Sequence, residues 1–155
     1  MDAQSLKLLN QLHPKLKDIA IKAWTEAQGA MPSNVKIVVT QSLRTFEESD
    51  KLYAQGRTTP GEIVTKAKAG QSYHNYGLAF DFKMITNGKD DWSVGPNWMK
   101  VVNIMKKYGF TWGGEFPEGF HDNPHFENHF GLNWRTLLEL HNNKKLIPGT
   151  DYVVI

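Results

Sequence analysis

The stretch from Ser72 to Phe82, SYHNYGLAFDF, combines a strand pattern with side chains that can carry chemistry. Its second half alternates, which predicts an extended segment with two unlike faces. One face is apolar and consists of Leu78, Phe80 and Phe82, while the other consists of Gly77, Ala79 and Asp81. A carboxylate inside an apolar strand needs a partner, and a metal ion can be that partner. The stretch therefore predicts a strand that packs on a core and carries a candidate metal ligand, Asp81.

Helical and β-branched patterns surround this strand and indicate an α+β fold. In the first half of the chain we expect a helix between Pro14 and Gly29, a strand over residues 35–40 (VKIVVT) and a helix from the capping box at residues 45–48 to about Gly56. A long loop over residues 56–71 follows. In the second half we expect one helix that starts at Pro96 and ends at Gly109, and a last helix that contains Trp134. No repeat or linker divides the chain. We therefore expect one domain over residues 1–155, a small and mainly antiparallel sheet with packed helices, and a motif-bearing core at about residues 35–130.

The composition of the 155 residues narrows the classes of function. With 40% hydrophobic residues and a net charge of +2, the chain is expected to fold and has no basic run suited to nucleic acid. It contains no cysteine, so disulfides and cysteine nucleophiles are excluded, and any metal must be held by His, Asp or Glu. The N-terminus has no pattern of a signal peptide or membrane helix, which predicts synthesis in the cytoplasm and no membrane partner.

Four of the six histidines lie in two short stretches with acidic residues nearby, namely His74, His121, His125 and His129. In a chain without cysteine, this clustering indicates a zinc site. His121 and His125 have a spacing typical of helical zinc motifs, but the segment between them contains a proline, which disfavours a helix. In an extended segment, His125 and Glu127 share the face opposite the core. His125 is therefore the favoured ligand, with Asp122 in the preceding turn and Glu127 as a neighbour that could orient it, and His121 is set aside.

Two spacings in these stretches are specific: S-x-H-x-x-G-x-A-x-D from Ser72 to Asp81, and D-x-x-H from Asp122 to His125. Together they resemble the M15 family of zinc peptidases, which contains D-Ala-D-Ala carboxypeptidases and dipeptidases and the L-alanyl-D-glutamate endopeptidases of phage endolysins and bacterial autolysins. The resemblance extends over about residues 35–130. It includes the W-G-G at 112–114. The segment SLRTFEESDKLYAQGR (42–57) and the stretch GRTTPGEIVTKAKAGQSYHNYG (56–77) are similar to the endopeptidase branch.

The resemblance implies a zinc cleft and a role for each matching residue. It makes His74, Asp81 and His125 the zinc ligands, Asp122 the general base, and Arg44 the residue that steadies the substrate carbonyl or its oxyanion. Three protein ligands leave a fourth zinc position for a water molecule, whose attack on an amide Asp122 would assist. Ser72 and Trp112 are expected to contact substrate, although Ser72 could equally cap the local turn.

The activity implied by the resemblance is hydrolysis of the peptide stem of peptidoglycan, at the bond between L-alanine and D-glutamate. The protein is expected to act as a monomer at the cell wall, which it would reach after release or by an export route that needs no signal peptide. Phage lysis, wall remodelling and delivery into a competitor all suit such a chain, and the sequence does not choose among them.

Other functions fit part of the same pattern. A D,D-carboxypeptidase of the same fold would use the same residues. A lysozyme-like glycosidase would pair Glu115 with Asp122 across a sugar cleft and would leave the first histidine motif without a role. A non-catalytic wall-binding module would hold zinc in a closed site, with His121 or His129 as a fourth ligand. Within the peptidase hypothesis, Glu115 and Glu118 are alternative bases.

Overall fold

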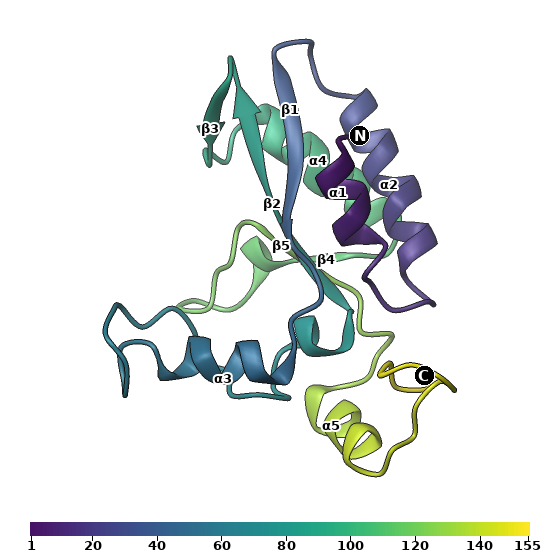
Figure 1. Ribbon diagram of the computed structural model, residues 1–155. Helices are drawn as coiled ribbons and strands as arrows, with labels where there is room; N and C mark the ends of the chain where they lie inside the picture. The colour runs from purple at the N-terminus through teal and green to yellow at the C-terminus, as the bar shows by residue number, and fades with distance from the viewer.

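The computed structural model describes residues 1–155 and contains five α-helices, five β-strands and two short 3-10 helices (Figure 1). The elements run in the order α1 (Ala3–Leu9), α2 (Lys17–Gly29), β1 (Val35–Gln41), α3 (Phe46–Ala54), η1 (Tyr73–Tyr76), β2 (Ala79–Thr86), β3 (Lys89–Asp91), α4 (Pro96–Lys107), β4 (Thr111–Trp112), η2 (Gly113–Glu115), β5 (His125–Glu127) and α5 (Trp134–Asn142). The predicted α+β class is confirmed, while α1, β3 and β4 are elements that the sequence patterns do not predict. No helix combines the length and apolar character that crossing a membrane requires.

β2 is the central strand of the sheet. The strands follow the order β1-β2-β5-β4, and every pairing is antiparallel. β1 pairs along one edge of β2, whereas β5 pairs with the first half of the other edge and β3 with the second half. Asp81 lies directly opposite His125 of β5 and, because β1 has a bulge after Val39, opposite Gln41. The register therefore brings Gln41, Asp81 and His125 into one row across three strands.

The core is built on the apolar face of β2. In Figure 1, α2 and α4 lie beside each other against the sheet, and α1 runs along β1. Trp24 of α2 packs edge-on against Phe80 and Phe82, and Trp98 of α4 packs on Phe82. All the residues that the alternation assigns to the apolar face are fully buried, as predicted. Because this face anchors β2 in the core, the polar residue Asp81 is held on a rigid strand.

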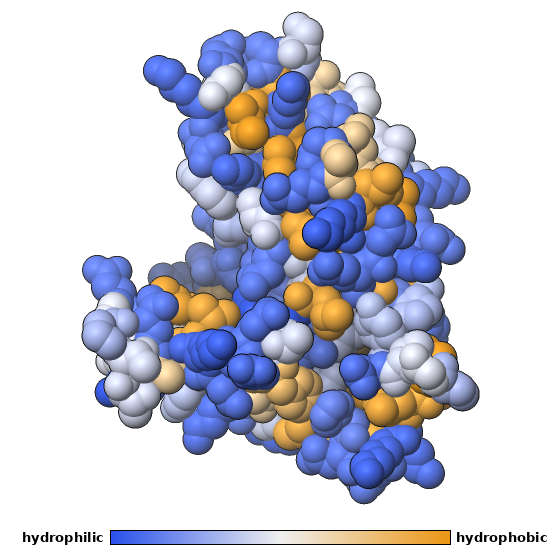
Figure 2. Space-filling model, viewed as in Figure 1, coloured by the Kyte–Doolittle hydropathy of each residue, from blue (hydrophilic) through white to orange (hydrophobic).

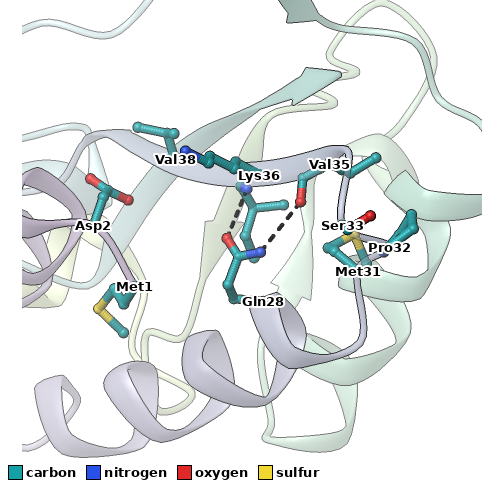
Figure 3. A pocket seen from close by; sticks show the side chains of 10 residues that line it. Met1, Asp2, Gln28, Met31, Pro32, Ser33, Val35, Lys36 and Val38 are labelled. Atoms are coloured by element: carbon teal, nitrogen blue, oxygen red, sulfur yellow. Dashed lines mark hydrogen bonds between the residues drawn. The ribbon is translucent and has the colours of Figure 1, made fainter. Parts of the chain in front are cut away.

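The outer edge of β1 is closed by side chains rather than by another strand. Gln28 of α2 donates from Nε2 to the Val35 carbonyl at 3.4 Å and accepts from the Ile37 amide at 3.0 Å, as Figure 3 shows. Ser5 of α1 accepts from the Val39 amide at 2.9 Å. These contacts satisfy backbone groups that a bare edge would offer to other chains. None of the predicted site residues lines the pocket drawn in Figure 3.

Three distant parts of the chain meet at Gly77, two residues before β2 begins. Gly77 ends η1 with a φ of 67°, and its carbonyl accepts from the His13 amide at 2.9 Å. His13 is buried, and its Nε2 lies 2.7 Å from the carbonyl oxygen of Val153. The N-terminal region, η1 and the C-terminal segment are therefore joined at the residue that leads into the strand carrying Asp81.

Replacing Gly77 by alanine should lower the free energy of unfolding more than Gly88→Ala does. Both glycines have a positive φ, 67° and 78°, so alanine is strained at each by about 1–2 kcal/mol. At Gly77 the new methyl group would also lie 2.7 Å from the His13 amide nitrogen, whereas at Gly88 it would meet nothing within 4 Å. Urea unfolding of the two variants measures the difference, and equal losses would contradict a tightly packed junction at Gly77.

Candidate active site

The predicted ligands His74, Asp81 and His125 come together at the start of β2. His74 lies in η1, Asp81 in β2 and His125 in β5. The Oδ1 atom of Asp81 lies 3.3 Å from His74 Nε2 and 3.0 Å from His125 Nδ1. One ligand atom from each residue lies within 4.8 Å of the other two, and no fourth His, Asp or Glu belongs to the group. Two imidazoles and a carboxylate at this spacing can hold a divalent metal ion with three protein ligands.

The outer nitrogen of each imidazole has a fixed partner. His74 Nδ1 lies 2.7 Å from the carbonyl oxygen of Ser42, to which only a protonated nitrogen can donate. His125 Nε2 lies 2.8 Å from Oε1 of Glu127, a buried carboxylate. With these nitrogens acting as donors, the neutral imidazoles would present the lone pairs of His74 Nε2 and His125 Nδ1 toward the centre of the group. The residues therefore fit a metal ion, because metal-binding histidines characteristically donate their other N–H to a carbonyl or carboxylate.

The charges in this group are strongly coupled. Burial by itself would raise the pKa of Asp81, but hydrogen bonds and charge from His125 and His74 hold that pKa well below its ordinary range. Burial by itself would lower the pKa of His125, but hydrogen bonds to Asp81 and Glu127 raise it to about 9. The carboxylate of Asp81 is therefore ionised at neutral pH, and a metal ion must compete with a proton for the inner nitrogen of His125.

Arg44 lies at the junction of β1 and α3, and its backbone is fixed from two sides. Its amide donates to the His74 carbonyl at 3.0 Å, and its carbonyl accepts from Asn75 Nδ2 at 3.0 Å. The guanidinium donates to the side chain of Gln41, which the bulge in β1 places in the cleft. Burial lowers the pKa of Arg44, and the nearby carboxylates, Asp81 foremost, oppose this change. Arg44 thus places a cation at a fixed position beside the ligand group.

Asp122 lies in a turn whose shape depends on a glycine. Its amide donates to the Gly113 carbonyl at 2.9 Å, and a Cβ at Gly113 would lie 2.2 Å from the Asp122 carbonyl oxygen. The Asp122 carboxylate stands 3.8 Å from His125 Nδ1, and its side chain is 52% exposed. Partial removal from water raises the pKa of Asp122, although the charge of His125 offsets part of the effect. A carboxylate beside the ligands, with a raised pKa, is suited to accept a proton.

A cleft of about 720 Å³ opens over the ligand group. Its walls come from the 56–71 loop on one side and the 116–122 loop on the other. Figure 2 shows the molecule hollowed between the sheet and the lobe that carries α3. The lining includes Gln41, Val64, Phe116 and Phe120, which sequence analysis did not single out. No local signal distinguishes these residues, because each lies in a segment whose pattern is that of an ordinary strand or loop.

The two residues predicted to contact substrate are placed differently. Ser72 lines the cleft, and its Oγ also accepts from the His74 amide at 3.2 Å, so it both caps η1 and faces the site. Trp112 is buried and does not line the cleft. Its indole Nε1 donates to the Asn123 carbonyl at 2.7 Å. Trp112 therefore supports the turn that carries Asp122 from the buried side of that turn.

The remaining histidines of the motif stretches lie outside the ligand group. His121 is exposed in the turn before Asp122. His129 stacks on Tyr73, with ring centroids 4.5 Å apart, and its Nε2 lies 3.6 Å from Oε2 of Glu127. Glu127 is thus placed between the two imidazoles of His125 and His129.

Comparison with known proteins identifies the family. A family model described as D-alanyl-D-alanine carboxypeptidase, one of the M15 peptidases, matches residues 65–128. The peptidoglycan L-alanyl-D-glutamate endopeptidase CwlK of Bacillus subtilis (strain 168) is 40% identical over 135 residues, which cover 80% of this chain and 77% of CwlK. The chain belongs to the M15 peptidase family. The resemblance inferred from the two motif spacings is therefore confirmed.

Two solved structures share the fold of this M15 peptidase. The L-Ala D-Glu endopeptidase ChiX of Serratia marcescens has a TM-score of 0.59 at 21% identity, over 84% of this chain and 90% of ChiX. The vancomycin resistance D,D-dipeptidase VanXYg, in complex with a D-Ala-D-Ala phosphinate analogue, has a TM-score of 0.58 at 20% identity. That match covers 83% of this chain and 54% of VanXYg. At such identities the similarity establishes the fold.

Glu127→Gln should weaken zinc binding by about 10- to 100-fold, the usual effect of removing a carboxylate that orients a ligating histidine. Glutamine keeps the size of the side chain but loses the negative charge that favours donation from His125 Nε2. Competition with a chromophoric chelator measures the affinity. Glu118→Gln is the matched control, because Glu118 lies in the same region of the chain, is exposed and has no histidine partner. An affinity unchanged by Glu127→Gln would contradict an orienting role.

Proposed function

We propose that this M15 peptidase is a zinc metallopeptidase that hydrolyses the bond between L-alanine and D-glutamate in the peptide stem of peptidoglycan. The observation that carries the proposal is the position of Asp122 and Arg44 beside a three-residue ligand group at the floor of an open cleft. A donor set of two imidazoles and one carboxylate favours zinc. The choice of bond is supported by the 40% identity to CwlK.

Asp122 is the group best placed to move the proton during amide hydrolysis. When bound, zinc supplies Lewis-acid chemistry, since it lowers the pKa of water toward about 7 and polarises a carbonyl group. Asp122 takes a proton from the attacking water and passes it to the nitrogen of the leaving amine. Its raised pKa suits both steps, because the carboxyl group can hold the proton between them. Glu115 is the weaker candidate, since it pairs with Lys106 and does not line the cleft.

Arg44 and Ser72 contribute to binding and to charge stabilisation in this proposal. The Arg44 guanidinium donates to the oxygen that becomes negative in the tetrahedral transition state. Hydrogen bonds from its backbone to η1 fix its position relative to His74, so the cation stays beside the ligand group. The Ser72 hydroxyl accepts from the His74 amide and retains its own proton to donate to substrate. We further propose action by the monomer at the cell wall, because every site residue comes from one chain.

A D,D-carboxypeptidase is the second candidate, supported by the description of the family model and by the fold shared with the dipeptidase VanXYg. It would use the same ligands, so only the product distinguishes it. A non-catalytic module with a closed zinc site is less well supported. His121 is exposed and His129 faces Glu127, so neither histidine belongs to the ligand group.

Mass spectrometry of the products from defined muropeptides tests the proposal. The new amino terminus should be D-glutamate or its amidated form, with L-alanine left on the lactyl group of the sugar, and a chelator should stop the reaction. Asp122→Asn should keep zinc and fold while turnover falls by about 100- to 10,000-fold, because an amide cannot accept the proton. Release of D-alanine alone would instead indicate the carboxypeptidase. New reducing sugar ends that persist in chelator would contradict a peptidase.

Arg44→Lys should lower kcat although it conserves the charge. The ammonium of lysine cannot reproduce the planar fork of donors that arginine presents to Gln41 and to substrate at the same time. Steady-state kinetics on a defined stem peptide measures kcat, and zinc content serves as the control for an intact site. A wild-type kcat in this variant would show that a positive charge alone is sufficient at this position.

A further inference from the structure

A lysine without an acidic partner stands at the mouth of the cleft. The ammonium of Lys66 lies 4.8 Å from the centroid of the Phe120 ring. Phe120 lines the cleft and is 59% exposed, so its ring is open to a ligand as well as to the lysine. Lys66 is exposed and is not itself a lining residue, but its neighbours in the chain, Thr65 and Ala67, line the cleft. The contact between the Lys66 ammonium and the Phe120 ring therefore joins the 56–71 loop to the 116–122 loop at the rim of the cleft.

The other cations around the cleft are directed away from its mouth. Arg57 uses its two terminal nitrogens to donate to the carbonyls of Tyr53 and Thr65, and so ties the loop to α3. Lys68 lies over the ring of Tyr53, which does not line the cleft. Arg44 is directed to the metal-ligand group. Neither Lys66 nor Lys68 takes part in an ion pair, but only the ring partner of Lys66 lines the cleft. Lys66 is therefore the cation placed to meet an anion at the mouth.

The proposed substrate supplies such an anion. Glutamate has two carboxyl groups, and only one of them can form the amide that continues the stem peptide. The residue that follows the scissile bond therefore carries a carboxyl group outside the chain, as a free carboxylate or as its neutral amide. This residue holds the leaving nitrogen, so it must lie next to Asp122, which delivers the proton to that nitrogen. Phe120 is two residues before Asp122, within about 7 Å of chain, and it carries the Lys66 ammonium on its ring.

We propose that Lys66 binds the free carboxylate of D-glutamate and makes the enzyme prefer stems with that carboxylate over stems in which it is amidated. The inference rests on the proposed function and adds a specificity-determining residue to it. Phe120 acts as a positioning residue, because its ring holds the flexible lysine side chain over the cleft. An exposed ion pair of this kind supports a preference of about fivefold.

The test uses two synthetic stem peptides that contain L-Ala-D-Glu followed by lysine. The peptides are identical except for the carboxyl group of D-glutamate that lies outside the peptide chain, which is free in one and amidated in the other. The ratio of their kcat/KM values is measured for the wild type, Lys66→Met, Lys66→Arg and Lys68→Met. We expect a ratio of about five for the wild type and Lys66→Arg, and about one for Lys66→Met. Lys68→Met is the matched control, since it removes the same charge from the same loop and should keep the wild-type ratio.

The outcomes separate this inference from the proposed function. Absence of cleavage of both peptides by the zinc-loaded wild type would refute the proposed function itself. Cleavage of both peptides with a ratio unchanged in Lys66→Met would overturn the role of Lys66 alone. An equal loss of preference in Lys68→Met would also overturn it, because the loop's net charge would then explain the effect. Zinc content and thermal unfolding of each variant confirm that the fold and the ligand group are intact.

Discussion

The Asp81 carboxylate must have partners for its charge, and the elements that surround β2 supply them. It lies on the central strand of the sheet, and its Oδ1 atom is within 3.3 Å of one imidazole and 3.0 Å of the other. A mostly buried carboxylate is stable only if its charge is compensated, and here two histidines supply that compensation. The same arrangement aims three ligand atoms at one point. The two histidines that compensate the charge of Asp81 are therefore also the residues that can bind a metal ion with it.

The scaffold fixes this centre through a small number of rigid connections. The aromatic side chains on the opposite face of β2 bury it against α2 and α4, so Asp81 is not free to move. Antiparallel pairing with β5 brings His125 opposite Asp81, and Glu127 on the same strand sets the orientation of the His125 ring. Asn75 then joins η1 to the neighbouring segments, since its side chain accepts from two backbone amides and donates to the Arg44 carbonyl and to Ser49 Oγ. The cation, the ligands and the cleft wall are thus held as one unit.

Much of this arrangement could be predicted from the sequence because it depends on local patterns. The alternation over residues 77–82 predicts both the buried face of β2 and the polar face of Asp81, and the proline before His125 correctly argues against a helix there. Elements held by long-range contacts have no such signal. The strand β4 is two residues long and forms only because β5 pairs with it, and the bulge that moves Gln41 into the cleft depends on the pairing of β1 with β2. Residue type alone does not tell which aromatic side chain lines the cleft. The buried indole of Trp112 supports a turn, whereas Phe120 lines the cleft.

The partners of the outer imidazole nitrogens decide which atoms remain to bind the metal ion. A crystal structure of the zinc-loaded protein, with anomalous diffraction measured at the zinc edge, identifies those atoms. We predict one zinc ion per chain, bound by His74 through Nε2, His125 through Nδ1 and Asp81 through a carboxylate oxygen, with zinc–nitrogen distances of about 2.0–2.1 Å. Zinc bound through Nε2 of His125, or through Glu127 in place of Asp81, would show that Glu127 does not orient the His125 ring.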